Sequence, residues 1–456
     1  LLLRSAPPRR WYTLLSWVQP PRLQKIFKSF FIIAHLGFAF LLKCDKIYCL
    51  IFLQGGEDLS ALLSPFREFF QKGDRILLSL CLAASGFGVI LIYSATRWQQ
   101  DYKEVIVQLV AIFLGVIAYM VMTSVDFQLF TEKNWKGLLI FSVVMILLLL
   151  TPLGLSIYGN RNWLQLSKLI PKFPMNLQPN EIDKLPFILL LSLLICRIRD
   201  RGMDISSIPS VMQIGGFTVF MLGLIAAICG DMGTCVVYMI IFVVMAWSAG
   251  VKVRWFVLVG GGLVAAVLIL WFFILPDTDL WDSNYIIMRF RVVLDHSLDP
   301  QDKGFQQSRS ILAIGSGQLF GQGLLHGIQT QADYSSALPA RDTDFIFAVC
   351  GEELGMVGCL ALLSLLFLIV LRCVWVSRRA SSPFFAYVCM GMAGMLLAQI
   401  LLNVGMCLYV LPVMGLTLPF ISYGGSSIIT LFAAMGIVSS VKARMLPSWL
   451  RNQSNA

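Results

Sequence analysis

The stretch FIFAVCGEELGMVGCLALLSLLFLIVL (residues 345–371) decides the fold class of this chain. Its only charged side chains are those of Glu352 and Glu353. A helix of about 20 apolar residues crosses the hydrocarbon core of a bilayer, which is about 30 Å thick. This stretch therefore predicts a transmembrane helix that carries two acids at membrane depth.

Nine further apolar runs predict spans of the same kind. The fourth run is short, so we expect its helix to begin before Lys184. All ten predicted spans are 76–95, 104–123, 136–154, 184–197, 213–229, 233–249, 255–275, 345–371, 384–411 and 425–441. The predicted fold class is thus all-α: a polytopic membrane protein with ten transmembrane helices and a large extracytoplasmic loop, 276–344, between the seventh and the eighth.

The composition agrees with a lipid environment. Hydrophobic residues make up 58% of the chain and charged residues only 13%, whereas about a quarter of the residues of a soluble domain are charged. The eleven cysteines mostly lie inside apolar runs and form no CxxC motif, so they behave as small hydrophobes and argue against a structural zinc site.

The formal net charge of +10 reflects membrane topology and not nucleic-acid binding, because no nucleic-acid-binding motif is present. Basic residues are enriched in cytoplasmic loops. The loops after spans four, six, eight and ten carry such residues, namely Arg197, Arg199, Arg201, Lys252, Arg254, Arg372, Arg378, Arg379, Lys442 and Arg444. We therefore place these loops and both chain termini in the cytoplasm, and the loops 96–103, 155–183, 230–232, 276–344 and 412–424 outside it.

Three regions follow along the chain. Residues 1–75 form a basic N-terminal extension, which fits an interfacial helix or a short hairpin, with a poorly ordered extension as the alternative. Residues 76–444 form the membrane domain, and 445–456 form a cytoplasmic tail.

Polar residues gather where the outer loops meet the spans. Arg161 and Trp163 lie in GNRNWLQ (159–165), where a turn with an interfacial Trp is the simpler interpretation. Glu181 and Lys184 are three residues apart at the start of the fourth span, so they share a helical face and can pair. Asp231 lies in the short link between spans five and six, where it is either a helix N-cap or a residue at membrane depth.

The polar group before span eight is chemically the most suggestive. Asp344, in RDTDFIF (341–347), is the last acid before the long apolar run. A carboxylate that is partly desolvated beside a polar loop is suited to be a general base. Glu352 and Glu353 lie about two turns deeper, where an acid is costly unless it is functional or paired.

Two glycine-rich segments complete the set. Residues 304–323 contain Gln306, Arg309 and several glycines, and generic loop flexibility is the simpler interpretation of those glycines. The segment 411–427, LPVMGLTLPFISYGGSS, contains Ser422 and Tyr423 and follows Asn403. Such broken backbone at membrane depth has to line protein or a cavity.

Taken in order, these motifs resemble the SEDS family of shape, elongation, division and sporulation proteins. The resemblance rests on GNRNWLQL, QPNEIDKL, DMGT, GFQQ with AIGSG, DTDFIFAVCGEELG, and NVGM with LPVMGLTLPFISYGGSS, between residues 76 and 444. It departs from the family pattern at Asp342, where His is usual, at Arg309, and at Gln318.

The resemblance implies a peptidoglycan glycosyltransferase that polymerises the lipid-linked disaccharide lipid II, by inverting transfer, in the bacterial plasma membrane during elongation, division or sporulation. It implies that Asp344 is the catalytic residue. It also implies supporting or substrate-binding roles for the residues Trp163, Glu181, Lys184, Asp231, Gln306, Glu352, Asn403, Ser422 and Tyr423.

The chemistry requires a base near the attacking sugar hydroxyl and positive charge near the pyrophosphate leaving group. Asp344 is the expected base, or alternatively a ligand of a divalent cation such as Mg²⁺ or Mn²⁺. Charge and topology suggest four phosphate partners: Arg161, Lys184, Arg309 and Arg341. The resemblance also implies a class B penicillin-binding protein as partner.

Two alternatives from other functional classes remain at this point. A lipid II flippase or transporter could use Asp231, Glu352 and Glu353 to line a pathway. A non-catalytic scaffold for a transpeptidase would use Asp344 only structurally. Neither alternative is excluded by the residues alone.

Overall fold

A computed structural model describes residues 69–99, 102–157, 160–165, 176–274, 288, 291, 303–332 and 337–445. Most of the predicted N-terminal extension and almost all of the predicted C-terminal tail lie outside the described residues, so the predictions for these two regions stay untested.

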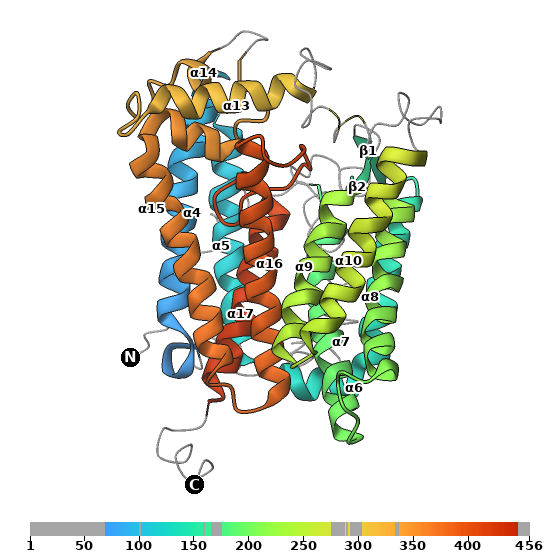
Figure 1. The fold of residues 1–456 in the computed structure, drawn as a ribbon. Coiled ribbons are helices and arrows are strands. Elements are labelled where there is room, and N and C mark those ends of the chain that lie inside the picture. Colours follow the sequence, from blue (N-terminus) through green and yellow to red (C-terminus); the bar gives the residue numbers. More distant parts are fainter. Residues whose placement is uncertain are drawn as a thin grey trace, which may run out of the picture.

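Each of the ten predicted spans corresponds to a helix (Figure 1). These helices are α4 (Arg75–Thr96), α5 (Lys103–Ser124), α6 (Phe127–Leu147), α7 (Pro179–Asp200), α8 (Ile208–Cys229), α9 (Met232–Ser248), α10 (Val253–Ile269), α15 (Ile346–Ser377), α16 (Pro383–Cys407) and α17 (Gly425–Ala443). Of these ten helices of the described chain, eight, two of them counted with the turn that follows, have the length and composition to cross a membrane. The two others are α9, which is apolar but 17 residues long, and α7, which begins with charged residues.

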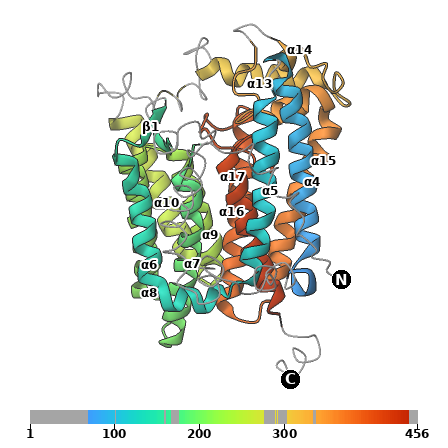
Figure 2. The same ribbon diagram turned by 180° about the vertical axis from the view of Figure 1, so that it is seen from behind.

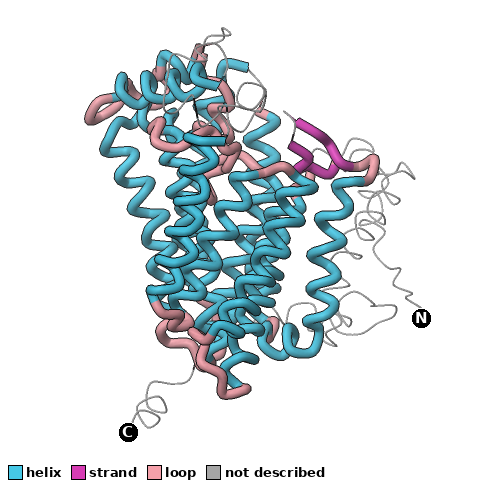
Figure 3. The backbone as a smooth tube through the Cα atoms, turned by 45° about the vertical axis from the view of Figure 1, so that its right-hand side comes forward, coloured by secondary structure: helices cyan, strands magenta, loops and turns pink. Residues whose placement is uncertain are grey.

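The bundle has two distinct ends (Figures 1 and 2). The predicted basic loops lie at one end, which we call the basic end. The other end, which we call the hairpin end, carries a two-stranded antiparallel sheet of β1 (Gly154–Ile157) and β2 (Asn160–Leu164). It also carries α13 (Lys303–Gly317), which lies across the bundle, and the short α14 (Ile328–Gln331). Figure 3 shows how small the sheet is beside the helices.

Local signals explain where the helices begin. The α7 helix starts at Pro179, as expected for a proline in the first turn. The α6 helix starts at Phe127 and not at residue 136, because Asp126 caps it by accepting hydrogen bonds from two amides of its first turn. The apolar run alone could not reveal that polar first part of α6.

Helix α16 connects the two halves of the bundle, since it packs against α15 on one side and against α7 and α9 on the other. Helices α5 and α17 also lie side by side. Their close approach depends on a small residue, because a Cβ on Gly436 would lie 2.7 Å from the carbonyl oxygen of Tyr119.

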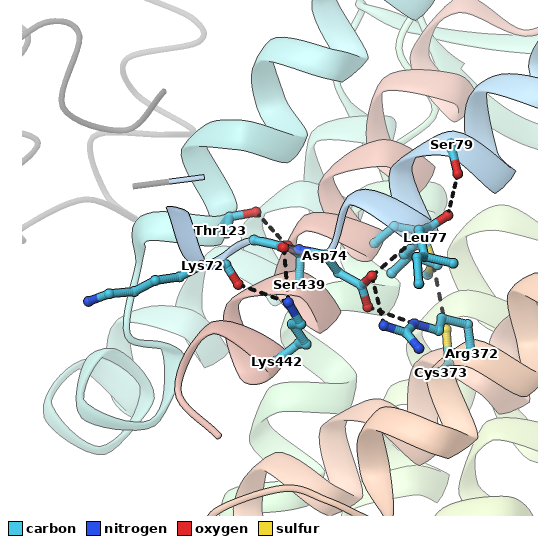
Figure 4. Close-up of polar contacts among 12 residues, drawn as sticks. Lys72, Asp74, Leu77, Ser79, Thr123, Arg372, Cys373, Ser439 and Lys442 are labelled. Atoms are coloured by element: carbon cyan, nitrogen blue, oxygen red, sulfur yellow. Dashed lines mark hydrogen bonds and ion pairs between the residues drawn. The ribbon is translucent and has the colours of Figure 1, made fainter. Parts of the chain in front are cut away.

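Two polar contacts tie α4 to α15 at opposite ends. At the basic end, the Arg372 guanidinium binds both carboxylate oxygens of Asp74, at 2.9 and 3.0 Å (Figure 4). At the hairpin end, Ser94 Oγ donates to the Glu353 carboxylate at 2.6 Å. About 20 residues separate the two contacts along each helix, which corresponds to about 30 Å. This distance matches the hydrocarbon thickness of a bilayer.

The contact at the basic end joins four helices. Besides Arg372, Asp74 is bound through its carbonyl oxygen by Tyr119 Oη at 2.7 Å, and its amide donates to Ser439 Oγ at 3.0 Å. These partners belong to α15, α5 and α17, while Asp74 caps α4 through the amide of Leu77. The carboxylate, the amide and the carbonyl of Asp74 are thus all satisfied inside the protein (Figure 4).

Arg372→Ala should lower the free energy of unfolding by about 3–5 kcal/mol, because it leaves the Asp74 carboxylate, 1% exposed, buried without its cation. Equilibrium unfolding in detergent micelles measures this change. The matched control is Lys252→Ala, whose partner Asp204 is 60% exposed; it should cost less than about 1 kcal/mol. Equal effects of the two substitutions would contradict a buried tie at Asp74.

Candidate active site

Asp344 lies half-buried at the hairpin end, in the turn that leads into α15. The carbonyl oxygens of three consecutive residues in this turn each accept a hydrogen bond from α16 or from the segment that follows it. The pairs are Tyr423 N to Asp342 O at 2.9 Å, Ser422 Oγ to Thr343 O at 2.6 Å, and Asn403 Nδ2 to Asp344 O at 2.9 Å. The main chain that carries Asp344 is therefore held at three successive points.

The segment 408–424 between α16 and α17 forms one wall beside Asp344. Asn403 also donates to Leu416 O at 2.7 Å, so one amide holds both the wall and the Asp344 backbone. Gly415 adopts a φ of +67°, and a Cβ there would lie 3.8 Å from Asp344 Oδ2. Bare backbone thus lies beside the carboxylate, and glycine is the residue that tolerates this conformation.

Gln108 of α5 holds the other end of this wall. Its amide nitrogen donates to Ser422 O at 3.1 Å, and its amide oxygen accepts from Gly424 N at 3.2 Å. Gln108 is fully buried. It was not among the predicted site residues, although a Gln inside an apolar span is the kind of residue that marks a buried polar site.

Glu181 and Lys184 form the predicted pair, at 2.5 Å, and the Lys184 side chain is fully buried. The second oxygen of Glu181 lies 3.4 Å from Gln399 Nε2 and 3.5 Å from Ser427 Oγ. Gln399 precedes Asn403 by four residues in α16, which is about 6 Å along the helix. The pair therefore lies about one turn deeper in the bundle than the backbone of Asp344.

Asp231 is the N-cap of α9, which was one of its two predicted roles. Its carboxylate accepts from Thr234 N at 3.0 Å and Thr234 Oγ1 at 2.7 Å. It also accepts from Asn162 Nδ2 of β2 at 2.8 Å, which attaches the hairpin to the bundle. A Cβ on Gly233 would lie 2.9 Å from Met414, so the start of α9 packs against the wall beside Asp344.

The other two predicted residues of the hairpin lie on β2. Trp163 is half-buried and pairs with Leu155 of β1. Arg161 is exposed. Both residues were predicted from the sequence, whereas Asn162 between them, whose amide makes the contact to Asp231, was not.

Glu352 and Glu353 of α15 accept hydrogen bonds that hold neighbouring elements together. Glu352 accepts hydrogen bonds from Gln329 N at 2.7 Å, Thr330 N at 2.8 Å and Thr330 Oγ1 at 2.6 Å. Glu353 accepts from Ser94 Oγ of α4 and, at 3.1 Å, from Gln331 Nε2. Both buried acids are thereby satisfied, and they hold α14 over the end of α15.

The four predicted phosphate partners differ in exposure. Arg341 is buried, stacks over the Trp98 ring at 4.5 Å and donates to the carbonyl oxygens of three residues, Gln329, Thr330 and Ala332. Lys184 is buried against Glu181. Arg309 is half-buried over the Phe305 ring at 5.0 Å. Arg161 and Arg309 are thus the two whose charge reaches the surface, and phosphate binding stays a prediction for all four.

The α13 helix docks through the residue after the predicted Gln306. Gln307 Nε2 donates to Met406 O at 3.0 Å and to Leu411 O at 2.7 Å, and Ser310 Oγ donates to Cys407 O at 2.8 Å. The carbonyls of Met406 and Cys407, at the end of α16, thus each accept a hydrogen bond from a side chain of α13. Gln306 itself is half-buried.

The glycine-rich segment after α13 is inserted into α15. Gly355 has a φ of +66° and breaks the helix. The amides of Met356 and Val357 bind carbonyls of residues 318 and 319 at 2.9 and 3.1 Å, while the amides of residues 322 and 323 bind the carbonyls of Glu352 and Glu353. We call residues 318–323 the inserted loop. Its amides and carbonyls bind the groups of α15 that would otherwise form two helical hydrogen bonds, from Met356 N to Glu352 O and from Val357 N to Glu353 O.

This insertion corrects the expectation of generic loop flexibility. A Cβ on Gly321 would lie 2.1 Å from Glu353 O, and a Cβ on Gly317 would lie 1.9 Å from Gly351 O. A Cβ atom does not fit at such distances. Only glycine therefore permits these backbone-to-backbone contacts.

The described residues contain no preassembled protein site for the predicted divalent cation. Among the described residues, no three His, Cys, Asp or Glu side chains are grouped closely enough to hold a metal ion. Mg²⁺ is commonly held by one or two carboxylates together with water and substrate phosphates. A cation at Asp344 would need such additional ligands, and its presence stays a prediction.

Comparison with known proteins agrees with this arrangement. The family model described as cell cycle protein, which comprises FtsW, RodA and SpoVE, matches residues 75–445. The chain belongs to this family. Among its SEDS relatives, peptidoglycan glycosyltransferase MrdB of Escherichia coli (strain K12) is 33% identical over 371 residues, covering 81% of this chain and 93% of MrdB. The probable peptidoglycan glycosyltransferase FtsW of Trichlorobacter lovleyi is 29% identical over 395 residues, covering 84% of this chain and 96% of FtsW.

Solved structures share the fold. A chain from a structure of a peptidoglycan synthase complex is 27% identical, with a TM-score of 0.65, and covers 81% of this chain and 97% of that chain. A mutant of the Thermus thermophilus rod shape determining protein RodA is 26% identical, with a TM-score of 0.58, and covers 82% and 99%. The predicted family and the all-α polytopic membrane fold are therefore confirmed.

Asp342 is the departure from the SEDS pattern that lies next to the site. Burial raises the pKa of its carboxyl, and the nearby Glu104 carboxylate raises this pKa further. Glu104 Oε2 is itself buried without a hydrogen-bond partner among the described residues. A negative charge at Asp342 is therefore unfavourable in the folded protein.

The sign of the resulting pH dependence follows from linkage. A carboxyl whose pKa is higher in the folded state stabilises the fold below its unfolded pKa of about 3.9. This contribution is lost as the pH rises through the folded pKa. We expect Asp342→Asn to unfold at a higher temperature than the wild type at pH 7, with a difference that shrinks towards pH 4.

The control for this pH series is Asp204→Asn. The Ser206 amide, at 3.0 Å, holds the pKa of the Asp204 carboxyl below its ordinary value, so this substitution should act in the opposite direction at pH 7. Thermal unfolding of both variants between pH 4 and pH 7 checks the pair. An Asp342→Asn protein less stable than the wild type at pH 7 would refute the assignment.

Proposed function

We propose that this chain, a peptidoglycan glycosyltransferase of the SEDS family, polymerises lipid II into glycan strands at the hairpin end of the bundle, with Asp344 as the general base. The observation that supports this proposal is the position in which the structure holds Asp344. Its backbone is fixed by Asn403 and the wall that follows α16, while its carboxylate lies half-buried beside the bare backbone of Gly415.

The reaction suits a single positioned carboxylate. A sugar hydroxyl attacks the anomeric carbon of the donor, a new C–O bond forms, and the anomeric C–O bond to the undecaprenyl pyrophosphate breaks with inversion. Asp344 accepts the proton of the attacking hydroxyl, which makes the oxygen a better nucleophile. The pyrophosphate leaves with the electron pair of the broken bond.

The leaving group requires positive charge. Arg161 and Arg309 are the candidates whose side chains reach the surface at the hairpin end. Lys184 and Arg341 act more indirectly, because Lys184 neutralises Glu181 and Arg341 holds the loop around α14. A divalent cation, if Asp344 binds one, would supply further charge at the pyrophosphate.

The rest of the proposed setting concerns membrane and partner. The positive-inside rule places the basic end in the cytoplasm and Asp344 outside it, at the bacterial plasma membrane. A relative forms part of a peptidoglycan synthase complex that couples polymerisation and crosslinking. A class B penicillin-binding protein is therefore the proposed partner here.

Asp344→Asn should lower the rate of glycan polymerisation by about 10²–10⁴-fold, which is the usual contribution of a general base. Purified protein with labelled lipid II, analysed as a ladder of glycan chains, measures the rate. The matched control is Asp342→Asn, two residues away, which should keep the rate within a few-fold. If Asp344→Asn forms the ladder as well as the wild type, Asp344 is not the base.

A transport assay distinguishes the flippase alternative from the proposed glycosyltransferase. The buried acids that would line its pathway are engaged in structural hydrogen bonds, Asp231 at the cap of α9 and Glu352 with α14. We expect the protein in liposomes to form glycan polymer from lipid II. Movement of lipid II across the bilayer without polymer would favour the flippase.

A further inference from the structure

The inserted loop exposes two large apolar side chains at its tip. Leu319 is 53% exposed, and Phe320 is 79% exposed, which is the largest value among the exposed large hydrophobic residues of the described chain. No contact described above for the proposed active site uses either side chain. A soluble surface seldom presents such a pair without an interaction partner.

The tip lies roughly one hydrocarbon thickness away from the contact between Asp74 and Arg372 at the basic end. The inserted loop is bonded to α15 at Met356, which is 16 residues, or about 24 Å, from Arg372 at the basic end. Glu353, three residues before Met356, contacts Ser94 at the hairpin end. This contact lies about 30 Å from the contact between Asp74 and Arg372. Phe320 therefore lies near the level at which acyl chains give way to headgroups.

The tip also continues the lipid-facing surface of α15. Met356, Val357 and Leu360 are 51–55% exposed on this helix. Because the amide of Val357 binds Leu319 O, the inserted loop lies directly above these side chains. In Figure 1 the yellow segment after α13 turns outward past the top of α15, at the edge of the bundle.

The charge pattern fits the same environment. Residues 310–332 contain no Asp, Glu, Lys or Arg, and His326 is their only titratable side chain. A water-facing segment of this length would carry several charges, since about a quarter of soluble residues are charged. A charged side chain among acyl chains is costly, so the absence of charge fits a segment whose Leu and Phe side chains are buried at the headgroup–acyl boundary.

The loop presents its tip with a defined geometry. Three of its residues have positive φ values: Gln318 at 48°, Gly321 at 80° and Gly323 at 101°. Such conformations persist where surrounding contacts determine them. Here the four backbone hydrogen bonds to α15 supply these contacts, so the position of the tip is coupled to the helix that begins after Asp344.

We infer that the inserted loop is a hydrophobic wedge whose tip, Leu319 and Phe320, is embedded among the acyl chains of the leaflet at the hairpin end. The wedge anchors the layer of α13 and α14 on the membrane surface. Its occupant is lipid, because the tip is continuous with the lipid-facing side of α15 and lacks neighbouring charge. This inference goes beyond the proposed glycosyl transfer and does not depend on it.

The test uses the full chain with the photoreactive residue benzoylphenylalanine in place of Phe320. The protein is reconstituted in vesicles of phosphatidylethanolamine and phosphatidylglycerol, irradiated, and analysed for lipid adducts by mass spectrometry. The same probe at Leu360, on the lipid-facing side of α15, is the positive control. The same probe at exposed Ser308, on α13, is the negative control.

We expect lipid adducts at position 320 within about two-fold of those at position 360, and at least five-fold above those at position 308. Adduct yield at position 320 as low as at position 308 would overturn the wedge. In native membranes, crosslinking of position 320 mainly to another protein would also overturn it, in favour of a docking surface for a partner's span. Lipid labelling requires no catalysis, so its failure is distinguishable from failure of the polymerisation assay.

Discussion

The absence of water inside the bilayer is the constraint on which this structure depends. Backbone amides and carbonyls at that depth need partners within the protein. Helix α15 breaks at Gly355, and the inserted loop supplies the partners that the break would otherwise leave unmet. The break in α15 therefore joins the layer of α13 and α14 at the hairpin end to a membrane helix. A shift of this layer would displace the helix, and the reverse also holds.

The two acids of α15 differ in burial from the acid that precedes this helix. Glu352 and Glu353 are fully buried, and their oxygens are occupied by amides and hydroxyls of α14 and α4. Asp344, just before the same helix, is half-buried, and Asn403 binds its carbonyl oxygen. The two deep acids hold α4 and α14 to α15, and the half-buried acid at the hairpin end is the proposed general base.

The candidate site was predictable in part. Asp344, Asn403, Ser422 and Tyr423 were named from motifs, and the structure brings them together through hydrogen bonds. The family comparison tests the fold and the family, while the individual roles of these residues stay proposals. Gln108 and Gln399 were missed because each is a single polar residue in an apolar run, and nothing local shows which neighbour it meets.

The sequence by itself determined the membrane class, the ten spans and the clustering of basic loops at one end. These properties depend on local length, apolar content and charge, since a span needs only enough apolar residues to cross the hydrocarbon. The tertiary structure decided which polar groups meet. Only packing brought Asn403 to the backbone of Asp344, buried Arg341 against its carbonyls and inserted residues 318–323 into α15. Contacts of this kind join residues from different parts of the chain, and their geometry exists only once the helices have packed.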